Sequence, residues 1–383
     1  MNKAGAVVAG HICIDITPLF PAAESASGGR VALGELLVPG SLLHMNGVDI
    51  HTGGAVANTA LAMRKFGVDA SLMGKVGRDA FGSMILDILR SYGAEKGMIV
   101  SDEASTSYSV VLAAPGCDRV FLHDPGANDH FYFADLDMNA IRDARLFHLG
   151  YPPIMASLFR NGGEELVKIF RTIDGMGVMT SLDLAAVDEA SEAGAVDWEA
   201  ILERTLPFTD FFFPSFEELA WMIDRVKYAE LKGRSGGDII SALSVEDDVR
   251  PLAEKAIALG AKVALVKCGA RGFYYRTAGG ERMAALERKR GASLEAWRDK
   301  RGFEKSYVPA RVLSATGAGD TTIAAFLSAM LQGRPFERCL QLAAAAGASC
   351  VEAYDALGGL KTLDELEKKI ESGWAKTGDE RCS

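Results

Sequence analysis

Residues 314–322 read SATGAGDTT, and good helix formers continue from there to Leu331. The glycines of this stretch therefore stand where a helix is predicted to begin. The first turn of a helix has free backbone N–H groups and a partial positive charge. Glycine lets an anion come close to such a backbone because it has no side chain. The stretch predicts a cradle for a phosphoryl group, formed by the backbone of Gly317, Ala318 and Gly319.

Asp320 falls in the first turn of this predicted helix. A carboxylate beside an anion-binding backbone is the arrangement needed to take a proton from an attacking hydroxyl. An ordinary aspartate has a pKa of ~3.9, so we expect Asp320 to be ionised at neutral pH. A capping aspartate is the alternative explanation, and for this stretch taken alone it is the commoner one.

A second glycine-rich stretch lies near the N-terminus, where residues 53–60 read GGAVANTA and residues 74–82 read GKVGRDAFG. Gly53 and Gly54 open a predicted helix, and Asn58 lies about one turn into it. The Asn58 amide both donates and accepts hydrogen bonds, which suits recognition of a hydroxyl. Asp15 follows the first predicted strand and could accept from a second hydroxyl, since ligands bind at the carboxyl ends of strands in open α/β sheets. For each residue alone, a surface or capping role explains it equally well.

Strand-like and helix-like segments alternate along most of the chain. The predicted strands are 6–16, 71–76, 146–149, 178–184, 210–214 and 263–267. The predicted helices are 58–66, 84–91, 163–176, 198–203, 249–259 and 336–352. This alternation indicates an α/β fold around a central, mostly parallel sheet. Without an internal repeat or a low-complexity linker, we expect one domain over residues 1–383.

Two stretches interrupt the alternation and predict a separate small sheet. Residues 31–52 are rich in Gly, Leu and Val, and residues 105–113 and 119–123 are typical of a β-hairpin with its turn at 115–118. We expect a β-sheet lid over the site, formed by approximately 14–52 and 104–124. An exposed lid sheet would also favour a homodimer.

Composition excludes several classes of protein. The 383 residues are 49% hydrophobic and 24% charged, and the formal net charge is −10. An acidic chain has no overall attraction for nucleic acid or an anionic membrane, so neither is expected as a partner. The six cysteines show no zinc spacing and favour reduced thiols and a cytoplasmic location. The apolar start is interrupted by His11 and Asp15, which predicts a buried strand rather than a signal peptide. Residues 282–305 are highly charged and predict a solvated helical insertion.

The two glycine-rich stretches together resemble the PfkB family of carbohydrate kinases, which has the ribokinase-like fold, and the resemblance runs from about residue 8 to residue 371. It implies a three-layer αβα architecture with a small lid. It implies that Asp320 is the general base and that the Gly317, Ala318 and Gly319 amides form an anion hole. The substrate-hydroxyl contacts that it implies are Asp15, Gly53, Gly54 and Asn58. The nucleotide-binding positions that it implies are Lys267, Gly269, Gly272, Thr316 and Ala346.

The resemblance also implies ATP and Mg²⁺, with Glu218 organising the metal through water. The chain departs from the family pattern at three positions. Ser215 stands where the family commonly has an Asn, and its hydroxyl can still orient a water. Ser314 stands where the family usually has an Asp near a monovalent cation, so activation by such an ion is not implied. Ala55 replaces the lysine of typical ribokinases, which argues against a strict ribokinase.

The sequence therefore predicts ATP-dependent phosphorylation of a hydroxyl on a sugar or sugar-like small molecule, without indicating which sugar. A nucleoside kinase of the same fold is one alternative, and Tyr108, Phe121 and Phe131 are candidates for contacting a base. A catalytically silent sugar-sensing protein is another, although such a protein should have lost the base or the glycines. A dinucleotide oxidoreductase is disfavoured, because residues 8–12 read VAGHI and lack G-x-G-x-x-G. His11 and His148 are then better explained as core or surface histidines than as proton carriers.

Overall fold

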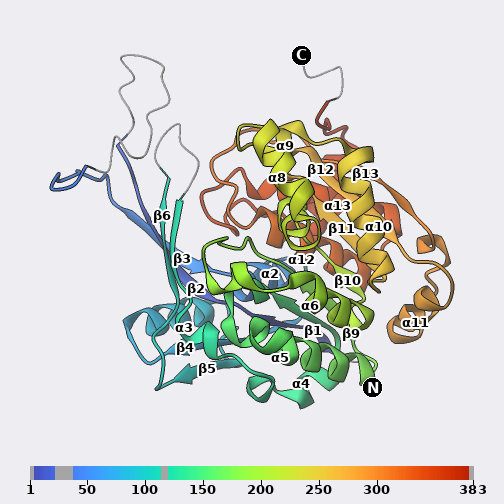
Figure 1. The fold of residues 1–383 in the computed structure, drawn as a ribbon, viewed down its shortest axis with the longest axis horizontal. Coiled ribbons are helices and arrows are strands. Elements are labelled where there is room, and N and C mark those ends of the chain that lie inside the picture. Colours follow the sequence, from blue (N-terminus) through green and yellow to red (C-terminus); the bar gives the residue numbers. More distant parts are fainter. Residues whose placement is uncertain (1–3, 22–37, 114–119, 379–383) are drawn as a thin grey trace.

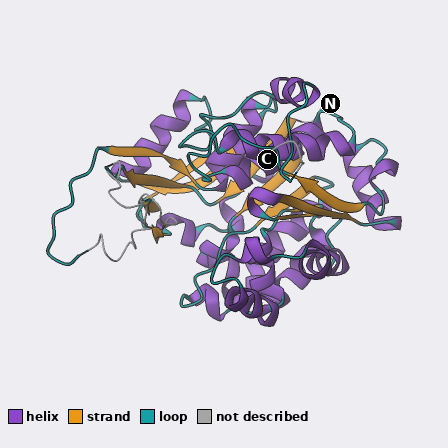
Figure 2. Ribbon diagram, turned by 90° about the horizontal axis from the view of Figure 1, so that it is seen from above, coloured by secondary structure: helices purple, strands orange, loops and turns teal. Residues whose placement is uncertain are grey.

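A nine-stranded sheet runs through the molecule with helices on both of its faces, in the computed structural model of residues 4–21, 38–113 and 120–378 (Figure 1, Figure 2). Its strands, in order across the sheet, are β13 (Arg301–Lys305), β12 (Gly272–Thr277), β11 (Val263–Lys267), β10 (Phe211–Phe212), β9 (Met179–Asp183), β8 (Ala144–Gly150), β1 (Ala4–Gly10), β4 (Ala70–Gly77) and β5 (Met98–Ser101). Neighbouring strands are parallel except for the antiparallel pairs β11–β12 and β12–β13. The predicted mostly parallel sheet is confirmed.

The sheet separates two hydrophobic cores, which is why its strands are apolar on both faces. In β1, Ala6 and Val8 belong to one core, and Val7 and Ala9 belong to the other. The first core is covered by α2 (Ala55–Lys65), α3 (Ala80–Ser91), α11 (Gly280–Arg290), α12 (Ala318–Leu331), α13 (Phe336–Cys350) and α14 (Leu363–Glu371). The second is covered by α4 (Met138–Asp143), α5 (Ala156–Gly175), α6 (Trp198–Thr205), α7 (Phe216–Ile223), α8 (Arg225–Arg234), α9 (Ile239–Ala242) and α10 (Arg250–Ala258). The three layers are those predicted.

A second sheet of four strands projects beside the large one (Figure 1). Its order is β3 (Val48–Gly53), β2 (Cys13–Pro18), β6 (Tyr108–Leu112) and β7 (Val120–Asp124), with β2 and β6 parallel and the other pairs antiparallel. The single strand expected over residues 6–16 is therefore two strands. The chain leaves the large sheet after Gly10 and enters the small sheet at Cys13. Of the segments predicted to form this sheet, residues 22–37 and 114–119 lie outside the described residues.

The expectation of a solvated insertion at 282–305 is wrong in part. Residues 280–290 form α11 and residues 301–305 form the edge strand β13. Met283, Leu286 and Trp297 are buried in the first core, because the two apolar helix residues stand three apart on one face. Only the opposite face of α11 is solvated. None of the described helices is long and apolar enough to cross a membrane.

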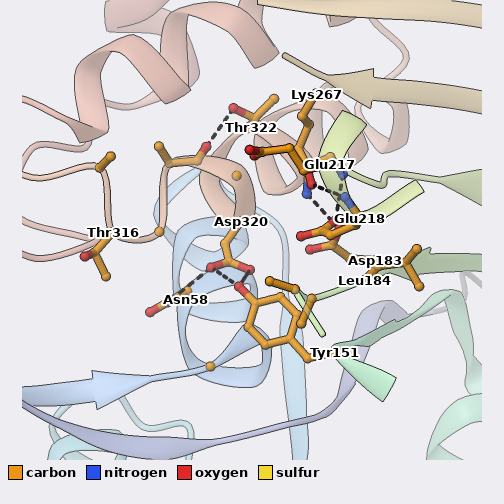
Figure 3. A pocket seen from close by; sticks show the side chains of 18 of the residues that line it. Asn58, Tyr151, Asp183, Leu184, Glu217, Glu218, Lys267, Thr316, Asp320 and Thr322 are labelled. Atoms are coloured by element: carbon orange, nitrogen blue, oxygen red, sulfur yellow. Dashed lines mark hydrogen bonds and ion pairs between the residues drawn. The ribbon is translucent and has the colours of Figure 1, made fainter. Parts of the chain in front are cut away.

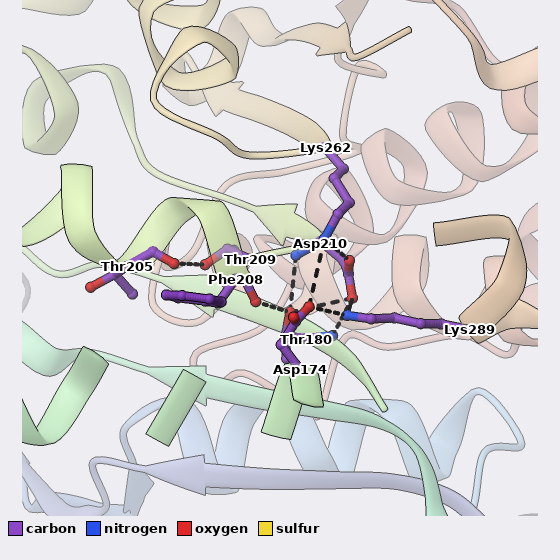
Figure 4. Close-up of polar contacts among 8 residues, drawn as sticks. All are labelled: Asp174, Thr180, Thr205, Phe208, Thr209, Asp210, Lys262 and Lys289. Atoms are coloured by element: carbon purple, nitrogen blue, oxygen red, sulfur yellow. Dashed lines mark hydrogen bonds and ion pairs between the residues drawn. The ribbon is translucent and has the colours of Figure 1, made fainter. Parts of the chain in front are cut away.

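A buried cluster of charged side chains connects α11 to the N-terminal ends of parallel strands in the large sheet (Figure 4). Asp210 is fully buried and accepts hydrogen bonds from Lys262 Nζ at 2.6 Å and from Lys289 Nζ at 2.7 Å. It also accepts from the Thr180 backbone N–H at 2.8 Å. Lys289 lies on α11 and also contacts Asp174 of α5 at 2.5 Å. The cluster therefore connects α11 in one helical layer and α5 in the other to the N-terminal ends of β9, β10 and β11.

We predict that Asp210→Asn destabilises the protein by about 3–5 kcal/mol, because the substitution removes one partner of a buried ion-pair network and leaves two ammonium groups undercompensated. Urea unfolding followed by circular dichroism measures the loss. Asp87→Asn is the matched control, since Asp87 pairs with Arg90 on the exposed surface of α3 and the change there should cost no more than about 0.5 kcal/mol. Equal midpoints for the two variants would contradict the stabilising role of the cluster.

Candidate active site

A cavity of about 1240 Å³ opens where the parallel strands end and the small sheet begins. The loops after β1 and β8 bring His11 and Tyr151 to it, and β9 and β11 bring Asp183 and Lys267. The small sheet contributes residues to the opposite wall. Ligands of open α/β sheets bind at the carboxyl ends of strands, so the cavity lies where such a fold offers a binding site.

The N-terminus of α12 points into this cavity. Gly317 is its N-cap residue, with a φ of 72°, and no side chain caps the helix. A Cβ atom at Gly317 would lie 2.3 Å from the Cβ atom of Ala356, so both the backbone angle and the packing require glycine there. This start of the helix carries partial positive charge, and among its N–H groups that of Ala318 donates to the Ala315 carbonyl oxygen at 3.3 Å.

Asp320 is 2% exposed and is surrounded by hydrogen-bond donors (Figure 3). Asn58 Nδ2 donates to Oδ2 at 3.0 Å and Thr59 Oγ1 donates to Oδ1 at 3.3 Å. The Tyr151 hydroxyl donates to both oxygens, at 2.9 and 2.8 Å. Burial raises the pKa of Asp320 above its usual value, and the bonds from Asn58 and Tyr151 oppose that rise. The ordinary carboxylate pKa expected from the sequence is thus wrong, because the group is buried rather than solvated.

The helix α2 brings Asn58 to Asp320 and begins at a tight crossing of two chain segments. Its N-cap residue Gly54 has a φ of 87°. A Cβ atom there would lie 2.6 Å from both the Nδ1 and the carbonyl oxygen of His11. The adjacent Gly53 is required for a different reason, since a Cβ atom on it would lie 2.2 Å from a carboxylate oxygen of Asp15. The two glycines therefore let α2 approach the end of β1 closely.

Asp15 lies on β2 at the small-sheet end of the cavity. It is 6% exposed, and burial raises its pKa. The Cys13 thiol donates to its Oδ1 at 3.3 Å. His11 and His123 line the same end, with ring centroids 5.1 Å apart, and burial lowers the pKa of both imidazoles. This end of the cavity thus offers a carboxylate and two neutral imidazoles as hydrogen-bonding groups.

The other end of the cavity combines a lysine with carboxylates. Lys267 Nζ lies 2.7 Å from Asp183 Oδ1, and Glu218 on α7 faces the same pair. Burial raises the pKa of Asp183, while the ammonium group beside it acts in the opposite direction. Burial alone would lower the pKa of Lys267, but Asp183 and Glu218 raise it overall. A Cβ atom on Gly319 would lie 3.4 Å from Lys267 Nζ, so this ammonium group stands beside the N-terminus of α12.

The carboxylates at this end suit a divalent metal that keeps most of its own ligands. No group of three or more His, Cys, Asp or Glu side chains among the described residues could hold a metal ion by itself. Mg²⁺ commonly uses one or two carboxylates, several waters and substrate phosphates. Asp183 and Glu218 provide hard oxygen atoms of this kind, so the residues fit Mg²⁺ held largely through water. Glu218 is fixed by a reciprocal cap, in which its Oε2 accepts from the Ser215 N–H at 2.6 Å.

The structure brings most of the residues singled out in the sequence to this one cavity. The lining positions are Asp15, Gly54, Asn58, Glu218, Lys267, Gly269, Gly272, Thr316, Gly317, Ala318, Gly319 and Asp320. Gly53 and Ala346 are not among the lining residues, and Ala346 is fully buried in the first core. Its helix α13 faces the cavity through Ala344, Gly347 and Ala348, because positions three or four apart share a helix face. Of the aromatic candidates for a nucleobase, Phe121 lines the cavity, whereas Phe131 is buried in the second core.

Tyr151 and Asp183 are cavity residues that the sequence analysis did not identify. Each stands at or just after the carboxyl end of a buried strand, which is the general signal that could have indicated them. Neither belongs to a glycine-rich motif. His148, one strand residue before Leu149, is buried and shares a hydrogen bond of 2.8 Å with Ser181. Burial lowers the His148 pKa to about 3, so the expectation of a core histidine is confirmed.

Comparisons with known proteins identify the family of the chain and agree with its fold. A family model described as pfkB family carbohydrate kinase matches residues 29–363. Fructokinase-1 of Oryza sativa subsp. japonica is 30% identical over 339 residues, which cover 84% of this chain and 88% of the rice protein. An uncharacterized sugar kinase of Archaeoglobus fulgidus is 24% identical and covers 78% of this chain and 98% of its own length.

Solved structures with the ribokinase fold superimpose on nearly the whole chain. Arabidopsis thaliana ribokinase, complexed with ribose and ATP, has a TM-score of 0.67 at 20% identity and covers 96% of this chain and 99% of its own. Ribokinase from Giardia lamblia has a TM-score of 0.70 at 16% identity and covers 97% and 99%. At these identities the likeness concerns the fold, and the ribokinase-like fold expected from the sequence is confirmed.

We predict that Gly317→Ala destabilises the protein more than Gly333→Ala does. Both glycines have positive φ, 72° and 80°, so alanine costs about 1 kcal/mol at each. A Cβ atom at Gly333 meets nothing within 4 Å, whereas one at Gly317 meets Ala356. Overpacking should add at least about 1 kcal/mol to the Gly317 variant. Urea unfolding of both variants measures the difference, and equal losses would show that Ala356 moves aside without cost.

Proposed function

Because the chain belongs to the PfkB family of carbohydrate kinases, we propose that it transfers the γ-phosphoryl group of ATP to a hydroxyl of a sugar or sugar-like molecule, with Asp320 as the general base. The observation that carries this assignment is the position of Asp320. Its carboxylate lies in the first turn of a helix that has no side-chain cap and whose residues 317–319 line the cavity. A base and an anion-binding backbone thus stand side by side, as phosphoryl transfer to an alcohol requires.

In the proposed reaction the sugar hydroxyl approaches Asp320 and gives up its proton to the carboxylate. The sugar oxygen forms a bond to the γ-phosphorus, the bond from that phosphorus to the bridging oxygen breaks, and ADP leaves. The amides of residues 317–319 stabilise the charge that spreads over the transferring group, and each such donor is worth roughly 3–4 kcal/mol when removed. Lys267 stands beside Gly319 and adds a positive charge at the same point.

The two ends of the cavity are assigned to the two substrates. ATP would lie at the end formed by Lys267, Gly269, Gly272, Thr316 and the cavity-lining face of α13. When bound, Mg²⁺ would neutralise phosphate charge there, with Glu218 and Asp183 holding its waters. The sugar would lie at the small-sheet end, where Asp15, Gly54 and Asn58 line the cavity and the adjacent Gly53 packs against Asp15. The names of the fructokinase and sugar kinase relatives favour a sugar over a nucleoside as acceptor.

We predict that Asp320→Asn lowers kcat by about 10²–10⁴-fold, because the amide cannot accept the hydroxyl proton. Binding of the sugar and of an ATP analogue should survive, since asparagine has nearly the same shape. Coupled ADP release across pentoses, hexoses, keto-deoxy acids and nucleosides identifies the substrate, and calorimetry measures binding. Asp102→Asn, at an exposed ion pair with Arg78, is the control and should leave kcat unchanged. Near-normal kcat in Asp320→Asn would end the assignment of the base, and the absence of transfer to every acceptor would favour a silent sugar-sensing protein.

We also propose that the small sheet acts as a lid and joins two copies of the chain. Its edge strands expose Val48 and Ile50 on β3 and Leu122 on β7. Exposed edge strands with apolar side chains are sites of association between chains. We expect sedimentation at micromolar concentration to give twice the chain mass of 40.8 kDa, and Ile50→Asp to lower it. A single-chain mass for the unaltered protein would exclude the dimer.

A further inference from the structure

Tyr151 takes an unusual place in the site. It follows Gly150 at the end of β8, and its hydroxyl donates to both carboxylate oxygens of Asp320, at 2.9 and 2.8 Å (Figure 3). Its ring also lies beside His11, with centroids 6.0 Å apart, so the phenol stands between the base and the small-sheet end of the cavity. A sugar hydroxyl that approached both oxygens of Asp320 from the cavity would need the same position.

The backbone of Tyr151 is strained. Its φ and ψ are 69° and 40°, in the left-handed region that bulky residues rarely adopt, and the residue precedes Pro152, which restricts it further. The other two non-glycine residues with positive φ among those described are Asn161 and Asp299, which are types that tolerate this region. Strain of this kind persists only where surrounding structure enforces it, and it is typical of functional sites.

Three donors surround the Asp320 carboxylate in this arrangement, and the Tyr151 hydroxyl bridges its two oxygens. An ionised carboxylate has about four lone-pair sites. Oδ2 accepts from Asn58 and Tyr151, and Oδ1 accepts from Thr59 and Tyr151. The single phenol proton is shared between the two oxygens, so the carboxylate receives three donated protons, and the position that bridges both oxygens opens to a substrate hydroxyl only when Tyr151 leaves it.

Tyr151 is the donor best placed to leave. Asn58 and Thr59 both lie on α2, a helix packed against α12, and they are 5% and 0% exposed. Tyr151 instead lies in the segment after β8, lines the cavity and is only partly buried. We propose that Tyr151 is a further catalytic residue of this kinase, whose hydroxyl holds the place of the acceptor alcohol on Asp320 until a sugar displaces it. This inference rests on the proposed function of Asp320.

The consequence is protection of ATP in the absence of sugar. A water molecule that reached Asp320 could give it a proton and attack the γ-phosphorus, which would break the bond to the bridging oxygen and yield ADP and phosphate. The phenol excludes water from that position. It remains a donor because burial and then the Asp320 carboxylate raise the pKa of Tyr151 well above its usual value.

The displaced hydrogen bond also affects the titration of the base. The titratable groups that face Asp320 from neighbouring elements are Tyr151, Lys267, Asp183, Glu218 and Cys350. The Tyr151 hydrogen bond favours the ionised carboxylate, so its loss raises the pKa of Asp320 further. Activity that needs the ionised base is lost as pH falls through that pKa, and the acid limb of kcat/KM should therefore move to higher pH.

The test is Tyr151→Phe, compared with Tyr132→Phe as the control at a half-exposed tyrosine outside the cavity. We expect ADP release without sugar to rise at least about fivefold in Tyr151→Phe, and the acid limb of kcat/KM to move up by about one pH unit. The control should change neither. Adding Asp320→Asn to Tyr151→Phe should abolish the excess hydrolysis, because the water would have no base.

Unchanged ADP release together with an unmoved acid limb would overturn the proposal and leave Tyr151 as a packing residue. If Tyr151→Phe melts too early to assay, Tyr151→Asn replaces it, because asparagine tolerates the left-handed backbone and is too short to reach Asp320. The outcomes are separable from the base assignment. Normal phosphorylation by Asp320→Asn would overturn the base itself, whereas an inactive Asp320→Asn with unchanged hydrolysis in Tyr151→Phe overturns only the role of the phenol.

Discussion

The structure depends on the burial of one carboxylate at the start of a helix. Taking an ionised Asp320 out of water is costly unless hydrogen bonds replace its hydration. The replacement comes from the positive end of α12 and from side chains of α2, so residues 262 positions apart in the chain meet at hydrogen-bonding distance. Their meeting requires glycine at both helix starts, because a Cβ atom at Gly54 or Gly317 would collide with a neighbouring segment. The two glycine-rich stretches thus act together, because each lets one helix come close enough to replace part of the hydration of Asp320.

The layered fold could be predicted from the sequence because each strand and helix carries its own periodic signal. Buried parallel strands such as 263–267 are apolar throughout, and helices such as 336–350 repeat small and apolar residues. The position of Asp320 at a helix start could be predicted for the same local reason. The positions of side chains that contact a residue from a distant element could not be predicted in this way. Tyr151 follows a strand without any motif, and the orientation of Ala346 depends on which face of α13 meets α12.

The other differences between the sequence-based predictions and the structure concern charged groups, namely their pKa values and their partners. A sequence assigns each carboxylate its solution pKa, but burial raises the pKa of Asp15, Asp183 and Asp320 alike. The charged segment after residue 280 was expected in solvent, yet Lys289 lies against Asp210 in a cluster that the local sequence does not indicate. In both cases the deciding partner comes from a distant part of the chain. The local sequence therefore predicts which segments carry charged residues, whereas the partners of those residues depend on the three-dimensional fold.

The helices that set the geometry of Asp320 are packed through small side chains. Alanine makes up much of the buried face of α2, α12 and α13, so these helices touch nearly backbone to backbone. Small side chains at these contacts let the helices approach closely, and the close approach holds Asn58 Nδ2 at 3.0 Å from Asp320 Oδ2. Asp15 and His123, by contrast, belong to strands of the separate small sheet. One part of the molecule, the closely packed helices, therefore sets the distance between Asn58 and Asp320. Substitutions in the small sheet can change the wall around the acceptor without altering that distance.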